Sequence, residues 1–269
     1  MQMQFLRPLS WVGGKTKADK FISSFFPNKI KRYVELFAGS AAIGLRLMFN
    51  DKVDEIILND INSDLMTFWN DVKTNNIINK YPKFNSVEEA KNIYNSLPKF
   101  GKKGWETLFQ NRLGWSGREN NTFSITRYEL KYYDCLERVK LCEYLLNKYN
   151  AILENKNYFE IIKIYDDKNT VFYLDPPYYI ANVSAMYKHY KFDYKELLYY
   201  LKNIKGKFIL SLNNCEYIKN LFSNFFQIEW EKIYDMKHKN KLIELGQELL
   251  IMNFKPNISE QLKLFKECD

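Results

Sequence analysis

Short apolar runs rich in β-branched and aromatic residues alternate with stretches of helical length towards both ends of the chain. The runs that predict strands are residues 33–36, 55–58, 151–154, 170–174 and 207–212. Each is followed by a turn and enough residues for a helix, which is typical of βαβ units and a parallel sheet. We therefore predict an α/β fold. Runs 226–234 and 248–254 have no helical stretch of ordinary length between them, so we expect an antiparallel hairpin at the sheet edge.

The middle of the chain, residues 66–148, lacks this alternation. Helical stretches there surround a loop at residues 110–122, and a long helix is expected at 125–148. Its apolar face is formed by Leu130, Leu136, Leu141, Leu145 and Leu146. We interpret residues 66–148 as a mainly helical subdomain inserted between the second and third strands of a domain formed by residues 1–65 and 149–269.

The composition supports one sizeable core and a polyanionic partner. Of the 269 residues, 46% are hydrophobic and 27% are charged, which excludes an intrinsically disordered chain. The net charge of +8 suits nucleic acid, although a composition biased towards Lys and Asn would supply the same surplus. Four cysteines without a CxxC pair and only two histidines argue against a zinc site or a disulfide scaffold. With no signal-peptide core and no apolar run of about 20 residues, we expect a soluble, cytoplasmic protein without a membrane span or metal.

The most informative motif is Asp-Pro-Pro-Tyr, which follows the fourth predicted strand. Ligands bind at the carboxyl ends of parallel strands, and the consecutive prolines Pro176 and Pro177 make this turn rigid. Asp175 and the Pro176 carbonyl can accept both hydrogens of an exocyclic amino group, while Tyr178 stacks on the ring that carries it. A simple strand-to-loop proline stop is the alternative.

Three weaker motifs surround the first two strands. Residues 35–44 form a turn of small residues that opens a helix, where a ligand can approach the backbone or a glycine can merely aid packing. Asp60, about 20 residues further on, lies where ribose hydroxyls bind in such folds, but Asp60 can instead cap the next helix, as can Asn62 and Ser63. The segment with Trp11 and Lys15 can close over a ligand or be an ordinary turn.

Taken in order, these segments resemble the Dam-type (D12 class) family of DNA adenine-N6 methyltransferases. The family's W-x-G-G-K matches residues 11–15, its E-x-F-x-G matches 35–39, its D-I-N-x-D-L matches 60–65 and its D-P-P-Y matches 175–178. Residues 208–213 resemble its fifth strand. The chain departs from the family at Ala41, where many relatives have a second glycine, but alanine is small enough to preserve the turn.

The resemblance implies a Rossmann-like methyltransferase fold, S-adenosylmethionine as donor and a target-recognition role for the insertion. By this resemblance, Trp11 and Lys15 contact the donor, Phe37 and Gly39 line its amino-acid end, Asp60 holds its ribose, and Asp175 lies between donor and target. Tyr158 and Phe159 are expected to border the donor's adenine ring or to serve the core. The reaction is methyl transfer to N6 of an adenine flipped out of double-stranded DNA, by direct attack with Asp175, Pro176, Pro177 and Tyr178 as the catalytic set.

The loop at residues 111–118 is the candidate reader of the DNA sequence. Arg112 and Arg118 can pair with guanine and Asn111 with adenine, whereas Lys102 and Lys103 are expected to contact phosphates. Trp115 can wedge into the base stack or anchor the loop on its own helices, and we favour anchoring.

Three alternatives stay open at this point. A cytosine-N4 methyltransferase needs the same amino-group chemistry, and only the acid of the motif, in place of serine, ranks it lower. A nicotinamide-dependent oxidoreductase would use Asp60 but leaves Asp-Pro-Pro-Tyr without a role. A non-catalytic nucleic-acid-binding protein explains the charge but not an intact donor site. The DNA site, and whether a cognate restriction endonuclease is a partner, cannot be read from the chain.

Overall fold

The computed structural model describes residues 7–10, 18–115, 122–126, 134–179, 192–233 and 245–256. Its centre is a seven-stranded sheet in the order β3-β2-β1-β4-β5-β7-β6. The strands are β1 (Ile30–Glu35), β2 (Val53–Asn59), β3 (Ile152–Glu154), β4 (Thr170–Leu174), β5 (Lys207–Asn213), β6 (Phe226–Ile233) and β7 (Leu245–Met252). The strands β1 to β5 pair in parallel, and β7 pairs antiparallel with both β5 and β6. The predicted α/β fold and the hairpin are therefore confirmed.

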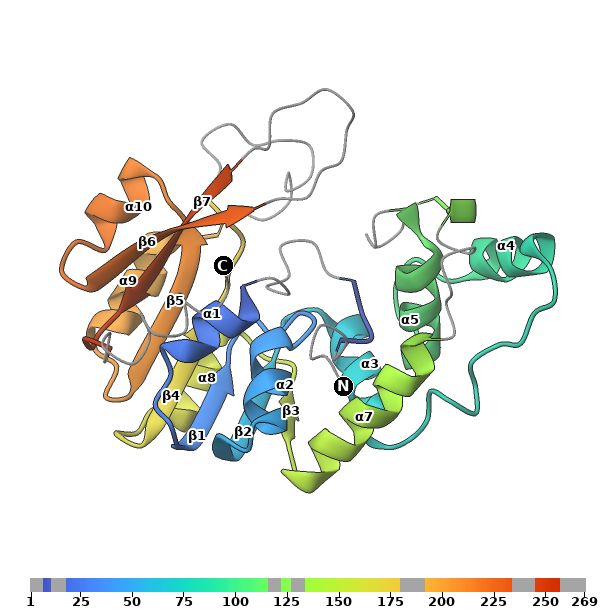
Figure 1. The fold of residues 1–269 in the computed structure, drawn as a ribbon, viewed down its shortest axis with the longest axis horizontal. Helices are drawn as coiled ribbons and strands as arrows, with labels where there is room; N and C mark the ends of the chain where they lie inside the picture. The colour runs from blue at the N-terminus through green and yellow to red at the C-terminus, as the bar shows by residue number, and fades with distance from the viewer. Residues whose placement is uncertain are drawn as a thin grey trace, which may run out of the picture.

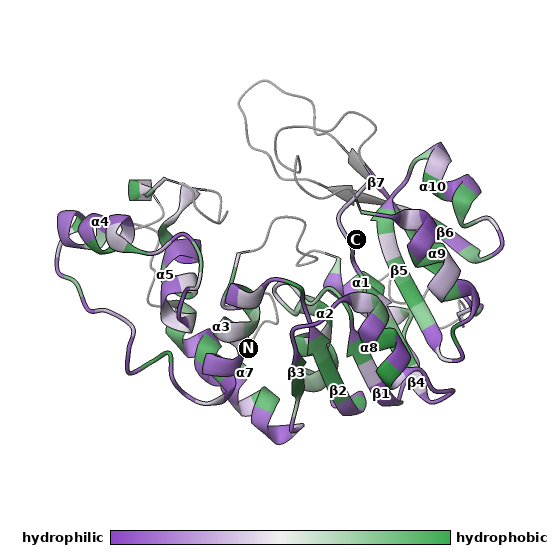
Figure 2. Ribbon diagram, turned by 180° about the vertical axis from the view of Figure 1, so that it is seen from behind, coloured by the Kyte–Doolittle hydropathy of each residue, from purple (hydrophilic) through white to green (hydrophobic). Residues whose placement is uncertain are grey.

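Helices cover both faces of this sheet (Figures 1 and 2). One face is covered by α1 (Asp19–Ser24), α2 (Ala42–Phe49), α3 (Ser63–Lys73) and α7 (Asp134–Lys148), and the other by α8 (Tyr158–Tyr165), α9 (Tyr194–Lys202) and α10 (Glu216–Leu221). In β4, Val171 and Tyr173 face the first group while Phe172 and Leu174 face the second. Because both faces are buried, the parallel strands are continuously apolar, as the sequence pattern indicated.

The helical segment between β2 and β3 does not separate from this core. The α3 residues Phe68 and Trp69 are fully buried, and they share one apolar cluster with Leu145 and Leu146 of α7 and with residues of α2. The helices α5 (Gly104–Leu113) and α4 (Val87–Ser96) lie beyond α3 and α7, farther from the sheet (Figure 1). The expected inserted subdomain at 66–148 is thus not confirmed as a separate unit, because its proposed boundary cuts through α3.

The long helix expected at 125–148 is observed as α7 over Asp134–Lys148, and residues 127–133 lie outside the described part of the chain. Cys135 and Cys142 of this helix are buried in the core, and burial raises the pKa of both thiols. Within the described ranges, no helix is long and apolar enough to span a bilayer. The same residues contain no group of three or more His, Cys, Asp or Glu that could hold a metal ion.

A buried acid joins β1 to α2. Glu35 is 2% exposed, and its Oε2 accepts hydrogen bonds from the Tyr33 hydroxyl (3.0 Å) and from the backbone N–H of Gly44 (2.9 Å). A Cβ on Gly44 would lie 2.7 Å from the same oxygen, so only glycine allows α2 to approach so closely. Burial raises the pKa of Glu35 to about 8, opposed by these two hydrogen bonds and aided by the charges of Asp175 and Asp60.

The raised pKa of Glu35 predicts that the stability of the protein depends on pH. The folded state holds the proton up to about pH 8, whereas the unfolded chain releases it near the ordinary value of 4.5. Between these values the folded state binds more protons, so the free energy of unfolding falls as the pH rises, by at most about 1.4 kcal/mol per pH unit. Glu35→Gln, which keeps an acceptor oxygen, should flatten this slope in urea titrations from pH 5 to 9. The exposed Glu229→Gln is the control, and an unchanged slope in the Glu35 variant would contradict the assignment.

Candidate active site

The strand order reverses between β1 and β4. From β1 the chain continues to β2 and β3 on one side of the sheet, and from β4 it continues to β5 on the other. Ligands of open α/β sheets bind in the crevice at such a switch point, outside the carboxyl ends of the strands. Two of the motif segments follow these strands, a glycine turn at residues 36–41 and a proline loop at residues 175–179. They start side by side, because the Leu36 N–H donates to the Tyr173 carbonyl (3.0 Å).

The glycine turn has a left-handed backbone at two positions. Gly39 has a φ of 50° and Ala41, just before α2, has a φ of 51°. Glycine adopts this conformation readily and alanine only under constraint. The constraint comes from α3 and β2, since Trp69 donates its indole N–H to the Gly39 carbonyl (3.0 Å) and Asp60 Oδ2 accepts the Gly39 N–H (2.9 Å). These two hydrogen bonds therefore fix the backbone of the turn at the carboxyl edge of the sheet.

Asp60 does not cap α3. The cap is Asn62, whose side chain accepts the backbone N–H of Leu65 (3.1 Å), while Asp60 Oδ1 accepts the N–H of Asn62 itself (3.0 Å). Asp60 is half-buried at the end of β2. A carboxylate offers about four acceptor positions, and backbone amides use at least two of those of Asp60.

Asn59 is a functional candidate that sequence reasoning missed. It is 1% exposed, and its amide donates to the carbonyls of Leu36 (3.0 Å) and Lys156 (3.1 Å) while its oxygen accepts the Lys156 N–H (3.0 Å). This single side chain ties together the loops after β1 and β3. The available signal was a polar residue at the end of a buried strand, just before the Asp60 motif.

Aromatic side chains line the α8 side of the glycine turn. The ring of Tyr158 lies 5.6 Å from that of Phe37 and 5.7 Å from that of Phe192, and its hydroxyl donates to Glu196 (3.0 Å). Phe159 stacks on Tyr200 of α9 at 5.8 Å. Both predicted aromatics thus pack α8 against α9, and Tyr158 also contacts Phe37. No motif marked Phe192, because it lies far along the chain.

Three elements hold the proline loop. The Tyr194 hydroxyl of α9 donates to the Pro177 carbonyl (2.5 Å), and the Asn213 amide of β5 donates to the Tyr179 carbonyl (2.8 Å). The Tyr178 hydroxyl donates to Glu248 of β7 (2.6 Å). The sequence had not marked these three partners as site residues, because each is distant from the motif along the chain.

Burial keeps the hydroxyls beside the proline loop protonated. The pKa values of Tyr173 and Tyr178 are raised well above 10, mainly by burial and further by the nearby Asp175 carboxylate. Asp175 itself is half-buried. The site therefore has acidic groups close to phenols that stay protonated and cannot serve as bases at neutral pH.

The segment before Trp11 is anchored beside the glycine turn, and Trp11 and Lys15 themselves lie outside the described residues. Arg7 donates to the Ser40 hydroxyl (3.0 Å), and Asn111 of α5 forms two bonds with the backbone of Ser10 (2.8 and 2.7 Å). Asn111 is only 5% exposed. This placement does not fit the expectation that Asn111 reads a base, because its amide already holds the amino-terminal segment.

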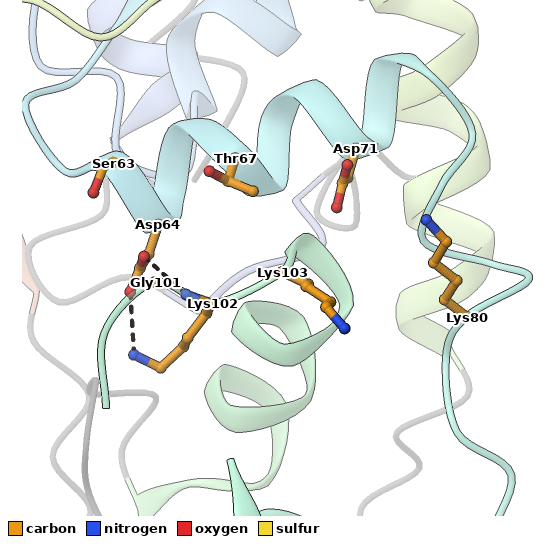
Figure 3. A pocket seen from close by; sticks show the side chains of 8 residues that line it. All are labelled: Ser63, Asp64, Thr67, Asp71, Lys80, Gly101, Lys102 and Lys103. Atoms are coloured by element: carbon orange, nitrogen blue, oxygen red, sulfur yellow. Dashed lines mark hydrogen bonds and ion pairs between the residues drawn. The ribbon is translucent and has the colours of Figure 1, made fainter. Parts of the chain in front are cut away.

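Lys102 is placed differently from the expected phosphate contact. Its side chain is 2% exposed and its Nζ lies 3.3 Å from Asp64 Oδ2, so its charge is already paired inside the protein. Figure 3 shows the pocket of about 560 Å³ that this pair lines between α3 and the start of α5. The exposed Lys80 and Lys103 line the same pocket, so they, not Lys102, present charge to the solvent there.

The two described ends of the candidate DNA-reading loop pair with each other after α5. Gly114 pairs with Phe123, and the Trp115 N–H donates to the Thr122 carbonyl (2.8 Å). Trp115 is 61% exposed, and its expected anchoring role stays a prediction. Arg112 is half-buried beside Cys135 of α7, and Arg118 lies outside the described residues.

Comparisons with known proteins agree with these motifs. The chain is 23% identical over 255 residues to the Type II methyltransferase M.CviBI of Paramecium bursaria Chlorella virus NC1A, covering 86% of this chain and 92% of that protein. It is 25% identical over 287 residues to the Type II methyltransferase M.MjaIII of Methanocaldococcus jannaschii, covering 91% and 98%. It is 27% identical over 194 residues to the DNA adenine methylase of Haemophilus influenzae, covering 63% of each.

A family match covers most of the chain. The D12 class N6 adenine-specific DNA methyltransferases match residues 11–153 and 105–236, which include all four motif segments. The mostly parallel seven-stranded sheet is consistent with a methyltransferase-like fold. The cytosine, oxidoreductase and non-catalytic alternatives are not favoured by these findings. The chain belongs to the D12 class of N6 adenine-specific DNA methyltransferases.

Proposed function

We propose that this DNA adenine methyltransferase uses S-adenosylmethionine as donor and methylates N6 of an adenine that is flipped out of double-stranded DNA. The observation that carries the proposal is the meeting of the glycine turn and the proline loop at the β1–β4 switch point. A donor held by the first and an amino group held by the second would be neighbours. Proximity and orientation supply much of the rate of such a transfer.

The residues around the glycine turn fit the donor. Asp60 would hold the ribose hydroxyls, Phe37 and Gly39 would line the amino-acid end, and Trp11 and Lys15 would approach from the amino-terminal segment that Asn111 anchors. When bound, S-adenosylmethionine supplies an electrophilic methyl group on a positively charged sulfonium. A positive charge suits an edge where Asp60 and Asp175 lie near the protonated Glu35.

The proline loop suits the amino group of adenine. Tyr194 occupies the Pro177 carbonyl and Asn213 occupies the Tyr179 carbonyl, while no hydrogen bond within the described ranges engages the Pro176 carbonyl. Asp175 and this carbonyl would each accept one N6 hydrogen, which favours a nitrogen with a localised lone pair. The bound nitrogen would then attack the methyl group directly.

Flipping makes the buried amino group of a duplex adenine accessible. Extruding the base costs a few kcal/mol, and stacking on an aromatic ring recovers about 1–3 kcal/mol. Tyr178 would provide that ring, adjacent to Asp175 in the same loop.

The DNA interface would extend from this site to the end of α5. The exposed Trp115 and the loop with Arg118 would contact bases or the gap left by flipping, and Arg112 would contribute from the base of the loop. The exposed Lys103, together with Lys80, would contact phosphates. Lys102 and Asn111 leave this proposal because both are buried with intramolecular partners.

The proposed reaction predicts the position of the transferred methyl group. Purified protein incubated with methyl-labelled S-adenosylmethionine and unmethylated DNA should place the label on adenine N6. Hydrolysis of the DNA and chromatography of the nucleosides identify the product, and sequencing of modified bases then identifies the site. Label on cytosine, or transfer to RNA only, would show the proposal to be wrong.

Asp175 is predicted to act on the reacting amine. Asp175→Ala should lower kcat by about 100-fold or more, because the acceptor of one N6 hydrogen is lost at the point where charge develops. DNA affinity, measured by fluorescence anisotropy, should stay within about threefold, since Asp175 contacts no phosphate. Asp54→Ala, an exposed acid paired with Lys29 (2.8 Å) at the far end of β2, is the control. Substantial turnover by Asp175→Ala would show that the acceptor is misassigned.

Asp60 is predicted to act on the donor. Asp60→Asn removes the charge but keeps one acceptor oxygen, and a charge-assisted hydrogen bond is worth about 1.5–3 kcal/mol. Calorimetry should therefore show S-adenosylmethionine binding weakened by about 10- to 100-fold. The thermal midpoint should also fall, because the new amide NH2 faces one of the two backbone N–H groups that the carboxylate accepts. Asp54→Asn on the same strand should bind the donor normally. Equal donor affinities in the two variants would leave Asp60 with only its role in the glycine turn.

A further inference from the structure

Glu248 is a fully buried carboxylate that no motif and no family expectation described above accounts for. It lies on β7 with 0% exposure, and the next two residues on the same face of that strand, Leu250 and Met252, belong to the apolar core. Acidic side chains are almost never fully buried unless a partner holds them. An apolar residue would pack there at less cost, so the carboxylate is expected to serve a purpose.

That purpose is visible in its contact with the proline loop. Glu248 Oε2 accepts a hydrogen bond of 2.6 Å from the hydroxyl of Tyr178, the aromatic residue of the Asp-Pro-Pro-Tyr motif. The pKa of Tyr178 is raised well above its usual value by burial and by the charges of Asp175 and Glu248, so the hydroxyl remains a donor. A short bond between a phenol hydroxyl and a carboxyl oxygen at the far end of the ring fixes the direction in which the ring points.

The neighbouring residue in the sheet makes a second contact with the same loop. In the antiparallel pairing of β5 with β7, Asn213 stands opposite Glu248. Asn213 donates its amide to the Tyr179 carbonyl (2.8 Å). The residue pair Asn213–Glu248 thus binds two consecutive loop residues. Glu248 accepts the side-chain hydroxyl of Tyr178, and Asn213 donates to the backbone carbonyl of Tyr179.

We propose that Glu248 is a positioning residue for methyl transfer, which holds Tyr178 so that a target adenine stacked on its ring presents N6 to Asp175. Asn213 fixes the adjacent backbone and limits rotation of the loop about this bond. The inference rests on the proposed role of the proline loop as the site of the target base. Glu248 would touch neither base nor donor, and it would act through Tyr178.

The experiment is a double-mutant cycle on the full chain. Glu248→Ala and Tyr178→Phe should each lower kcat about 10-fold or more, because a ring free to rotate misplaces the base. The double variant should be no worse than the poorer single variant, since both changes remove the same bond. Glu248→Gln keeps an acceptor oxygen and should restore most of kcat. A duplex with 2-aminopurine at the target adenine, in the site found by sequencing, should show altered fluorescence with Glu248→Ala.

Controls separate this inference from the proposed function and from a loss of folding. Glu229→Gln, on the adjacent β6 with an exposed side chain, should match wild type. Wild type that fails to methylate adenine would overturn the proposed function. With active wild type, an unchanged kcat in Glu248→Ala, or additive losses in the cycle, would overturn the positioning role. So would a loss that Glu248→Gln does not restore, or one that follows the thermal midpoint across the variants.

Discussion

Glu35 ends the central strand β1 with its carboxyl group removed from water, and both groups that hydrogen-bond to it are fixed by the fold. Burying this acid draws the first turn of α2 onto the sheet and requires glycine at position 44. The chain passes from β1 to this closely packed helix through a turn that has a left-handed backbone at Gly39 and Ala41. The same edge collects Asp60 and Asp175, whose charges help to raise the pKa of Glu35. The cost of gathering three acids is lowered by a proton on Glu35 and, in the proposed function, by a cationic donor.

The two halves of the site are held by different means. Around the glycine turn the holding groups are local, since Asp60, Asn59 and Trp69 all come from β2 and the helix after it. Around the proline loop they are distant, coming from α9, β5 and β7. In the proposed function, a loop held from three elements would lose little conformational entropy when a base binds.

Strand positions and motif placement were predictable because they depend on local pattern. A strand that is buried on both faces of the sheet is recognisable in the sequence as a continuous apolar run. An acid directly after such a run lies at the carboxyl edge of the sheet. Burial of single polar residues was not predictable. Asn111 and Lys102 lie in a polar, glycine-containing region, but their partners Ser10 and Asp64 are 101 and 38 residues away. The amphipathic pattern of α3 also does not reveal that its apolar face joins the core of the sheet.

The direction of β7 explains how a residue so late in the chain reaches the site. A parallel strand in that position would bring its last residues to the carboxyl edge, where ligands bind. Because β7 runs antiparallel to β5, its early residues lie there instead, and Glu248 stands opposite Asn213 at the end of β5. The hairpin therefore places the acid Glu248 at the carboxyl edge of the sheet, where the proline loop follows β4. The sequence pattern predicted the hairpin. It did not reveal the register of the β5–β7 pairing, which places Glu248 where it accepts the hydrogen bond from Tyr178.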